Sequence, residues 1–326
     1  MARSEGAAPA VTVVIPVLNE ADHLVAAVDS ALNQDYSGEI EVILALGPSR
    51  DGTDAIAQQL AAKNPRVKTV PNPTGRTASA LNGAIAASSH EFLVRLDGHS
   101  EIDRGYIRSA IETLLATGSV NVGGVMAAEG ITLFQRAVAR AMRSPLGVGN
   151  SRFHTGGEAG ESDTVYLGVF KKSALVAIGG FDERFTRAQD WELNYRLRSN
   201  GGKVWFDPRL HVTYRPRKNF RFLAKQYFEY GRWRRAVSRR HIGTVNYRYL
   251  APPTAVAINL LSIVLAVTTH PLFALPLIGY LTLISMGSLL IGKSWLERAL
   301  LPFVIFTMHM SWGMGFLTSP KRLVSG

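Results

Sequence analysis

The stretch VTVVIPVLNEADHLVAAVDSALNQ, residues 11–34, decides the fold class. Its first eight residues form a short apolar run rich in β-branched side chains, which is typical of a strand buried on both faces. The residues that follow place Leu24, Val28 and Leu32 on one side of a helix. Residues 11–34 therefore predict a strand–helix unit of an α/β protein.

The same strand–helix order repeats along the next part of the chain. Strands are predicted at 39–46, 67–72 and 91–97, and helices at 54–63 and 76–88. This alternation predicts a mostly parallel sheet with right-handed crossovers. Ligands of such sheets bind beyond the carboxyl ends of the strands. The loops after the strands at 11–18, 39–46 and 91–97 should therefore face one crevice.

Polar residues gather in these three loops: Asn19, Glu20, Asp51, Asp97 and His99. Asp-Gly is a common turn pair, so a plain turn is one interpretation of Asp97 and Gly98. The other is chemical, because an Asp and a neighbouring His can hold one divalent cation and leave positions for diphosphate oxygens. The chain has no glycine-rich dinucleotide motif and no P-loop. These two modes of nucleotide binding are therefore not indicated, and binding through a metal is the mode that stays open.

A second carboxylate group lies in QDWELNYRLRSNGG, residues 189–202. Asp190 stands where a predicted helix begins, and a carboxylate is stabilised there by the helix dipole. An N-cap is thus one interpretation of Asp190, and a catalytic carboxylate is the other.

The C-terminal part has the composition of a membrane domain. Apolar stretches at 251–269, 271–291 and 299–317 each approach the roughly 20 residues that cross a bilayer.

The chain has no cysteine, which excludes disulfides and thiolate metal sites. Residues 1–10 have no signal-peptide layout and are expected to be flexible.

The net charge of +11 is concentrated just before the first apolar stretch, where ten Lys or Arg and one acid lie between Arg215 and Arg240. Such clusters bind anionic headgroups and mark the cytoplasmic side. The segment 215–248 also carries apolar residues spaced by threes and fours: Phe220, Leu223, Tyr227, Tyr230, Trp233 and Val237. This stripe predicts a helix in the membrane interface, and packing on its own domain is the alternative. No motif of a nucleic-acid reader is present, so nucleic acid is not an expected partner.

The charges also bear on topology. Lys293 and Arg298 favour a cytoplasmic loop, so residues 251–291 should form a hairpin. The third stretch then either crosses the membrane or is re-entrant or interfacial.

The ordered set VVIPVLNE, SRDGT, ALNGAIAAS, LDGHS, GGFDERF, QDWELNYRLRSNGG and YGRWR resembles glycosyltransferase family 2 with the GT-A fold. Within that family it resembles the membrane-bound enzymes of bacterial exopolysaccharide assembly, such as succinoglycan glucosyltransferases. The resemblance implies a GT-A catalytic domain over 11–214 and then the C-terminal membrane helices. It departs from the family pattern at His99, where most members have Asp, and at Gln189, where the family has Glu. It also departs at Glu229, where the polymerising members have Gln.

The resemblance also implies roles for particular residues. Asp190 would be the catalytic base and Arg232 would meet the leaving-group charge, while Asp97 and His99 would bind Mn²⁺ or Mg²⁺. The donor site would comprise Pro16, Asn19, Glu20, Asp51, Arg76, Asn82 and Asp97. The acceptor side would comprise Gln189, Trp191, Glu229 and Trp233.

The implied reaction is inverting transfer of a sugar, as in a hexosyltransferase, from a nucleotide sugar to a hydroxyl of a lipid-linked saccharide. A UDP-sugar is the expected donor. The enzyme would lie in a bacterial plasma membrane as a multi-pass protein, touching lipids and keeping its catalytic domain cytoplasmic. Transfer onto a polyprenyl phosphate and a non-catalytic membrane-binding role are the alternatives. No oligomeric state is predicted.

Overall fold

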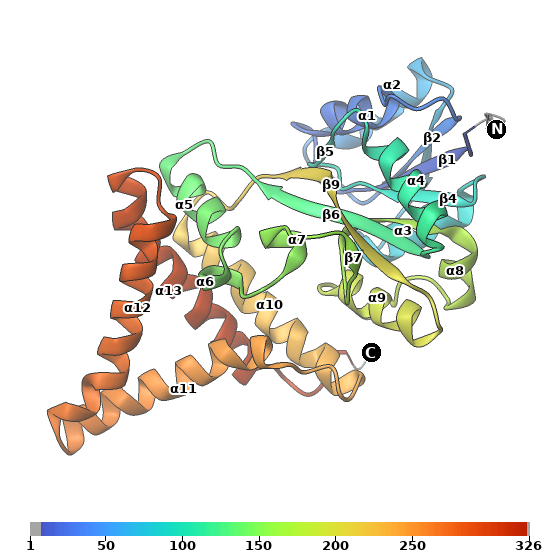
Figure 1. The fold of residues 1–326 in the computed structure, drawn as a ribbon. Coiled ribbons are helices and arrows are strands. Elements are labelled where there is room, and N and C mark those ends of the chain that lie inside the picture. Colours follow the sequence, from blue (N-terminus) through green and yellow to red (C-terminus); the bar gives the residue numbers. More distant parts are fainter. Residues whose placement is uncertain (1–7, 325–326) are drawn as a thin grey trace, which may run out of the picture. The chain divides into compact units, whose positions relative to one another are not determined.

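The computed structural model describes residues 8–324, which group into two compact units (Figure 1). The first unit contains the chain up to residue 127 together with 156–213, and the second contains 128–155 and the chain from 214 onward. Residues 128–155, which lie inside the catalytic domain expected over 11–214, group with the C-terminal helices. The expectation of a flexible N-terminus falls largely on residues 1–7, which lie outside the described residues.

The first half of the first unit has the predicted alternation. Its elements are β1 (Val11–Val17), α1 (Leu24–Leu32), β2 (Ile40–Leu46), α2 (Thr53–Lys63), β3 (Val67–Pro71), α3 (Thr77–Ala87) and β4 (Phe92–Arg95). Strands β3, β2, β1 and β4 pair in that order and in parallel. The predicted parallel sheet is confirmed, and the loops after β1, β2 and β4 leave it at the same edge.

The second half extends this sheet with antiparallel strands. It contains β5 (Glu101–Ile102), α4 (Tyr106–Thr117), β6 (Asn121–Ala128), β7 (Gly160–Glu161), β8 (Tyr166–Lys171), α8 (Lys172–Ala177), α9 (Gln189–Ser199) and β9 (Val204–Tyr214). The order across the sheet is β3-β2-β1-β4-β8-β6-β9-β5, and β7 pairs with β9. Because β8 runs antiparallel to β4, this half comes back beside the strand that ends in the Asp97 loop.

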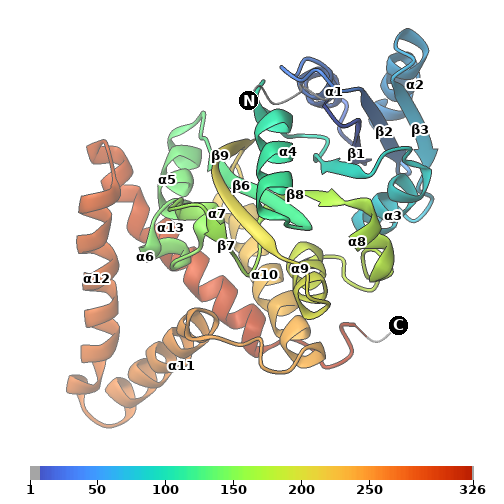
Figure 2. The ribbon, with the colours of Figure 1, turned by 45° about the vertical axis from the view of Figure 1, so that its right-hand side comes forward.

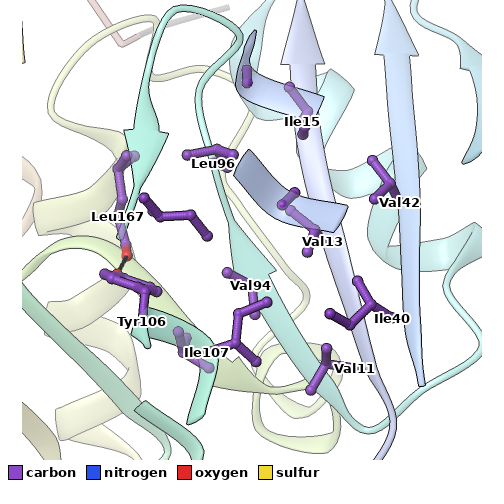
Figure 3. Packing of buried hydrophobic residues seen from close by; sticks show 14 of the residues in the cluster. Val11, Val13, Ile15, Ile40, Val42, Val94, Leu96, Tyr106, Ile107 and Leu167 are labelled. Atoms are coloured by element: carbon purple, nitrogen blue, oxygen red, sulfur yellow. Dashed lines mark hydrogen bonds between the residues drawn. The ribbon is translucent and has the colours of Figure 1, made fainter. Parts of the chain in front are cut away.

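The core of this unit lies between the sheet and its helices. Val13 and Ile15 of β1, Val94 of β4 and Ile107 of α4 are fully buried side by side (Figure 3). Burying one such side chain stabilises the fold by about 1.5–3 kcal/mol. The Tyr106 hydroxyl donates a hydrogen bond of 3.0 Å to the Leu167 carbonyl, so its polar end is satisfied. The loops at the strand ends thus rise from a rigid, packed sheet.

A buried carboxylate stabilises the opposite, amino end of the strands. Glu41 is 4% exposed and accepts hydrogen bonds from Thr12 (2.7 Å), Lys68 (2.5 Å) and the Ser89 backbone (3.1 Å). Burial alone would raise the pKa of Glu41, but the hydrogen bonds from Lys68, Thr12 and Ser89 outweigh it and lower the pKa to about 2. The ionised carboxylate is therefore strongly preferred in the folded state.

We expect Glu41→Gln to destabilise the first unit by about 3 kcal/mol at pH 7. A depressed pKa contributes stability above the unfolded value near 4.5, and that stability is lost as the pH falls toward 2. The difference in melting temperature between wild type and variant should therefore shrink between pH 4.5 and 2. Glu39→Gln, at a largely exposed carboxylate, is the control. If the variant's melting temperature were below that of the wild type by the same amount at pH 4.5 and at pH 2, the lowered pKa of Glu41 would be contradicted.

The second unit is helical. It contains α5 (Leu133–Met142), α6 (Pro145–Val148), α7 (Arg152–Thr155), α10 (Phe220–Arg240), α11 (Tyr247–Thr268), the short 3₁₀ helix η1 (Pro271–Ala274), α12 (Leu275–Ile291) and α13 (Trp295–Leu317). The helical segments Tyr247–Thr268, Pro271–Ile291 and Trp295–Leu317 are each long and apolar enough to cross a membrane. They match the three predicted apolar stretches.

The basic helix forms as predicted, but its apolar stripe is not free to touch lipid. Leu223, Tyr227, Trp233 and Val237 of α10 are at most 6% exposed. Helix α10 packs most extensively against α13, and that apolar helix covers the stripe. The prediction that the stripe rests on lipid is wrong for these four residues. The stripe is instead packed on α13, one of the three predicted membrane stretches.

Glycines let the backbones of α10 and α13 approach closely. A Cβ atom on Gly231 would lie 1.9 Å from the Trp312 carbonyl oxygen, and one on Gly315 would lie 2.0 Å from the Phe228 carbonyl oxygen. Because both neighbours are backbone atoms, the helices would have to separate to admit a methyl group.

We expect Gly231→Ala and Gly315→Ala each to lower the melting temperature of the detergent-solubilised protein, with an overpacking cost of about 1–3 kcal/mol. Gly279→Ala is the matched control, because a Cβ atom on that helical glycine would meet no neighbour within 4 Å. Melting curves that are the same for Gly231→Ala and Gly279→Ala would refute the close packing.

Candidate active site

Hydrogen bonds join the loops after β1 and β2. Asn19, which adopts a left-handed backbone conformation with φ of 56°, donates from its backbone N–H to the Ser49 hydroxyl at 3.0 Å. Its side-chain oxygen accepts a hydrogen bond of 2.8 Å from the Arg50 backbone. The Glu20 backbone N–H donates to the Thr53 hydroxyl at 2.8 Å. The two loops therefore form one connected structure.

Asp51 also connects the loops after β1 and β2. Its carboxylate accepts hydrogen bonds from the Thr53 hydroxyl at 2.5 Å and from the Ala21 backbone at 3.2 Å. These hydrogen bonds, that from Thr53 above all, lower the pKa of Asp51. The structure thus gives Asp51 a role in shaping the crevice, and its predicted contact with a nucleoside stays a prediction.

The loop after β4 joins this cluster through His99. The His99 Nδ1 atom lies 2.8 Å from a Glu20 carboxylate oxygen. Gly98, between Asp97 and His99, lies against this carboxylate: a Cβ there would be 2.9 Å from the Glu20 Cγ atom and would displace the Glu20 side chain. The predicted convergence of the three strand-end loops is confirmed.

Arg95 connects this loop to the second predicted carboxylate. It is the last residue of β4 and is 4% exposed. Its guanidinium donates to Asp97 at 3.1 Å and also to Asp190. One buried cation thus holds together two carboxylates that are far apart in the chain.

Sequence reasoning missed Arg95, although a signal was present. The strand FLVR is otherwise apolar, and a charged residue inside a buried strand needs charged or hydrogen-bonding partners. Asp97 and Asp190 are those partners.

The surroundings of Asp190 suit proton transfer. Burial raises the pKa of Asp190, Arg95 opposes this rise, and the negative charge of Asp97 adds to it. The Asp190 side chain is nevertheless 33% exposed, so one side of the carboxylate is open. A carboxylate with a raised pKa is a stronger base than an ordinary Asp.

The N-cap interpretation of Asp190 is wrong. Ala188, with φ of 57°, occupies the N-cap of α9, and no side chain caps this end of the helix. Asp190 is the second helical residue and its carboxylate points to Arg95. Gln189 before it is buried, and the Trp191 ring stacks on Tyr195 with centroids 5.8 Å apart.

Helix α3 fastens the loop that precedes α9. The Asn82 amide donates to the Phe181 carbonyl at 2.9 Å and to Glu183 at 3.0 Å, and its oxygen accepts from the Phe181 N–H at 2.8 Å. Asn82 is therefore a positioning residue in this structure. Arg76, just before α3, is exposed, and Pro16 lies half-buried in β1. Donor contacts by all three stay predictions.

The remaining predicted residues belong to α10 of the second unit. Arg232 donates to Glu229 at 2.9 Å, one turn away on the same helix. Both side chains are partly exposed, whereas Trp233 is buried. The roles of Arg232, Glu229 and Trp233 at a reaction centre remain predictions.

The donor atoms for a metal are few. Within residues 8–324, no three His, Asp or Glu side chains gather into a metal-binding group. Asp97 offers a carboxylate, the kind of ligand that Mn²⁺ and Mg²⁺ prefer, and His99 adds an imidazole on the same loop; ligand oxygens would have to complete the coordination. The residues present thus fit a cation that arrives with a diphosphate better than a permanently bound ion.

Comparison with known proteins agrees with this geometry. Residues 12–179 match the profile of glycosyl transferase family 2. The chain is 32% identical to the succinoglycan biosynthesis protein ExoA of Rhizobium meliloti, over 93% of each chain. It is 25% identical to a dolichyl N-acetyl-α-D-glucosaminyl phosphate 3-β-D-2,3-diacetamido-2,3-dideoxy-β-D-glucuronosyltransferase of Methanococcus voltae, over 97% of this chain and 98% of the relative.

Among solved structures that share the fold is the following example. It is a mannosyltransferase from Pyrobaculum calidifontis in complex with GDP-Man and Mn²⁺, with a TM-score of 0.59 and 19% sequence identity. The match covers 95% of this chain and 86% of the other.

Proposed function

Because the chain belongs to glycosyltransferase family 2, we propose that it transfers a sugar from a nucleotide sugar to a hydroxyl of a lipid-linked saccharide, with inversion at the anomeric carbon. The observation that carries this proposal is the Arg95 junction. It holds a partly open carboxylate, Asp190, beside the strand-end loop that contains Asp97.

The proposed chemistry assigns one proton transfer to Asp190. The acceptor oxygen attacks the anomeric carbon, the bond from that carbon to the diphosphate oxygen breaks, and the acceptor proton passes to the Asp190 carboxylate. Arg95 keeps this carboxylate oriented before the reaction. Arg232 is proposed to meet the charge of the departing nucleoside diphosphate, since a guanidinium stays charged and donates two parallel hydrogen bonds.

Asp97 and His99 are proposed to hold a divalent cation, Mn²⁺ or Mg²⁺, which would neutralise diphosphate charge when bound. The joined loops after β1 and β2 are proposed to hold the nucleoside, through Asn19, Glu20 and Asp51. Pro16, Arg76 and Asn82 complete the proposed donor side, and Gln189, Trp191, Glu229 and Trp233 the proposed acceptor side. We propose a UDP-sugar as donor.

The membrane helices support a lipid-linked acceptor. A chain with three apolar helices and a basic helix before them is suited to meet an acceptor at the bilayer surface. The Methanococcus voltae relative is named for a dolichyl-linked sugar phosphate. We propose a multi-pass protein of a bacterial plasma membrane with its catalytic unit on the cytoplasmic side.

The test is a donor screen with the full-length protein in detergent. UDP-sugars and GDP-sugars are supplied with Mn²⁺ or Mg²⁺ and a bacterial lipid extract, and lipid products are identified by mass spectrometry. We expect one donor to give a lipid-linked saccharide longer by one sugar. A sugar attached directly to a polyprenyl phosphate would establish the alternative reaction. Absence of transfer and of donor hydrolysis across all donors would contradict the proposal.

A further inference from the structure

Helix α13 has 23 residues and is therefore about 34 Å long, enough to cross a bilayer. We propose that α13 does not cross it. Instead, α13 lies along the membrane surface at the boundary of headgroups and acyl chains, and its partner is the lipid bilayer itself. The observations that carry this proposal all belong to the second unit.

The first observation is the charge of α10. Its 21 residues, FRFLAKQYFEYGRWRRAVSRR, include seven Lys or Arg and one Glu. Each Arg or Lys at the centre of a membrane helix costs about 2.5–3.5 kcal/mol on the insertion scale. Helix α10 therefore stays outside the hydrocarbon region.

The second observation is that the first turns of α10 and α13 both contact the short helix α5. The Phe220 ring of α10 packs on Phe134 of α5, with centroids 4.7 Å apart. The Glu297 carboxylate of α13 lies 3.4 Å from Arg136 and 3.9 Å from Arg140 of the same helix α5. The first turns of both long helices are thus held by one short helix.

The two helices also end together. Arg239, near the end of α10, donates to the Ser319 carbonyl at 3.0 Å and to the Pro320 carbonyl at 2.9 Å, just beyond α13. The Ser319 hydroxyl donates to the Arg232 carbonyl at 2.9 Å. Between the ends, His309 of α13 lies 2.9 Å from the Leu146 carbonyl of α6. Helix α10 cannot cross the bilayer. Because α13 is bound to α5 near its start, as α10 is, and to α10 itself near its end, we infer that α13 does not cross either.

The outward side of α13 is suited to lipid. Leu296, Phe303, Phe306, Met314 and Leu317 are between 38% and 64% exposed and recur at helical spacing. The opposite side is buried: Leu301, Val304, Ile305 and Met308. The exposed side of α13 thus offers apolar contacts to acyl chains, and the basic residues that an interfacial helix presents to headgroups are supplied by α10. Helix α13 thus takes the place that the sequence predicts for α10.

The other two apolar helices, α11 and α12, then enter the bilayer. In Figure 1 and Figure 2, α11, α12 and α13 form the three sides of a triangle and do not run side by side as a bundle. With α13 in the surface, α11 and α12 form the hairpin that enters the membrane. Lys293 precedes α13 and Lys321 follows it. If α13 does not cross, both lysines lie on the same side of the membrane, as the positive-inside rule favours.

The chain has no cysteine, so a thiol reagent reacts only with a cysteine that is introduced by substitution. Lys293→Cys and Lys321→Cys, both at exposed positions, are labelled with a membrane-impermeant maleimide in sealed vesicles of each orientation, and full labelling in detergent establishes that each thiol reacts. We expect both positions to be labelled from the same side. Labelling from opposite sides would overturn the proposal.

Depth gives a second measurement that does not depend on orientation. Nitroxide labels are placed on Phe306→Cys, in the middle of α13, and on Leu283→Cys, in the middle of α12; both side chains are exposed. Accessibility to oxygen and to a polar nickel reagent reports depth in vesicles. We expect position 306 to be markedly shallower than position 283. Equal depth would overturn the proposal even if positions 293 and 321 were labelled from one side.

Discussion

Replacing Asp190 with Asn should lower turnover at least 100-fold, the lower end of the contribution of a general base. An amide cannot take the proton of the acceptor hydroxyl, yet it has nearly the shape of the carboxylate. Donor binding should change little. The melting temperature should fall, because the substitution removes one of the two carboxylates that pair with the buried Arg95 cation. Turnover is measured with the donor and lipid acceptor that the screen identifies, and donor binding by calorimetry. Asp29→Asn, at an exposed position on α1, is the control.

The pH dependence gives an independent test of the same residue. Because burial raises the pKa of Asp190, the wild-type rate should fall, as the pH is lowered, at a pH above the ordinary range of an Asp. This acidic limb should be absent from Asp190→Asn. If Asp190→Asn kept full turnover, the acceptor would be an anion that needs no base, such as a polyprenyl phosphate.

Replacing Asp97 with Asn should weaken Mn²⁺-dependent binding of the nucleoside diphosphate by more than about tenfold. Even residues that only support a metal ligand cost 10–100-fold when changed. The substitution also removes one of the two carboxylates that orient Arg95, so turnover should fall further than binding does. Calorimetry with and without Mn²⁺ separates the metal-dependent part.

Asp103→Asn is the matched control for Asp97, because it changes an Asp on the following loop that no proposed step uses. Unchanged metal dependence in Asp97→Asn would remove Asp97 from the site. Loss of binding in the absence of Mn²⁺ as well would assign Asp97 to the shape of the donor pocket instead.

The sequence by itself determined the α/β class, the parallel half of the sheet and the three apolar helices. These features depend on local patterns: β-branched runs, helical periodicity, and apolar stretches of bilayer length. It also determined which loops converge, because parallel strands place their carboxyl ends at one edge. Hydrogen bonds then join the converged loops: Arg50 to Asn19, Glu20 to Thr53, Ala21 to Asp51, and one between His99 and Glu20.

Only the tertiary structure decided which distant residues meet. It placed Arg95 between Asp97 and Asp190, gave Asn82 a fastening role, and assigned residues 128–155 to the helical unit. It also showed that α13 packs over the apolar stripe of α10. Periodicity shows that a helix has an apolar side, but the partner of that side depends on close approach elsewhere in the chain. Here Gly231 and Gly315 permit that approach, and no local pattern reveals that the two glycines face each other's helices.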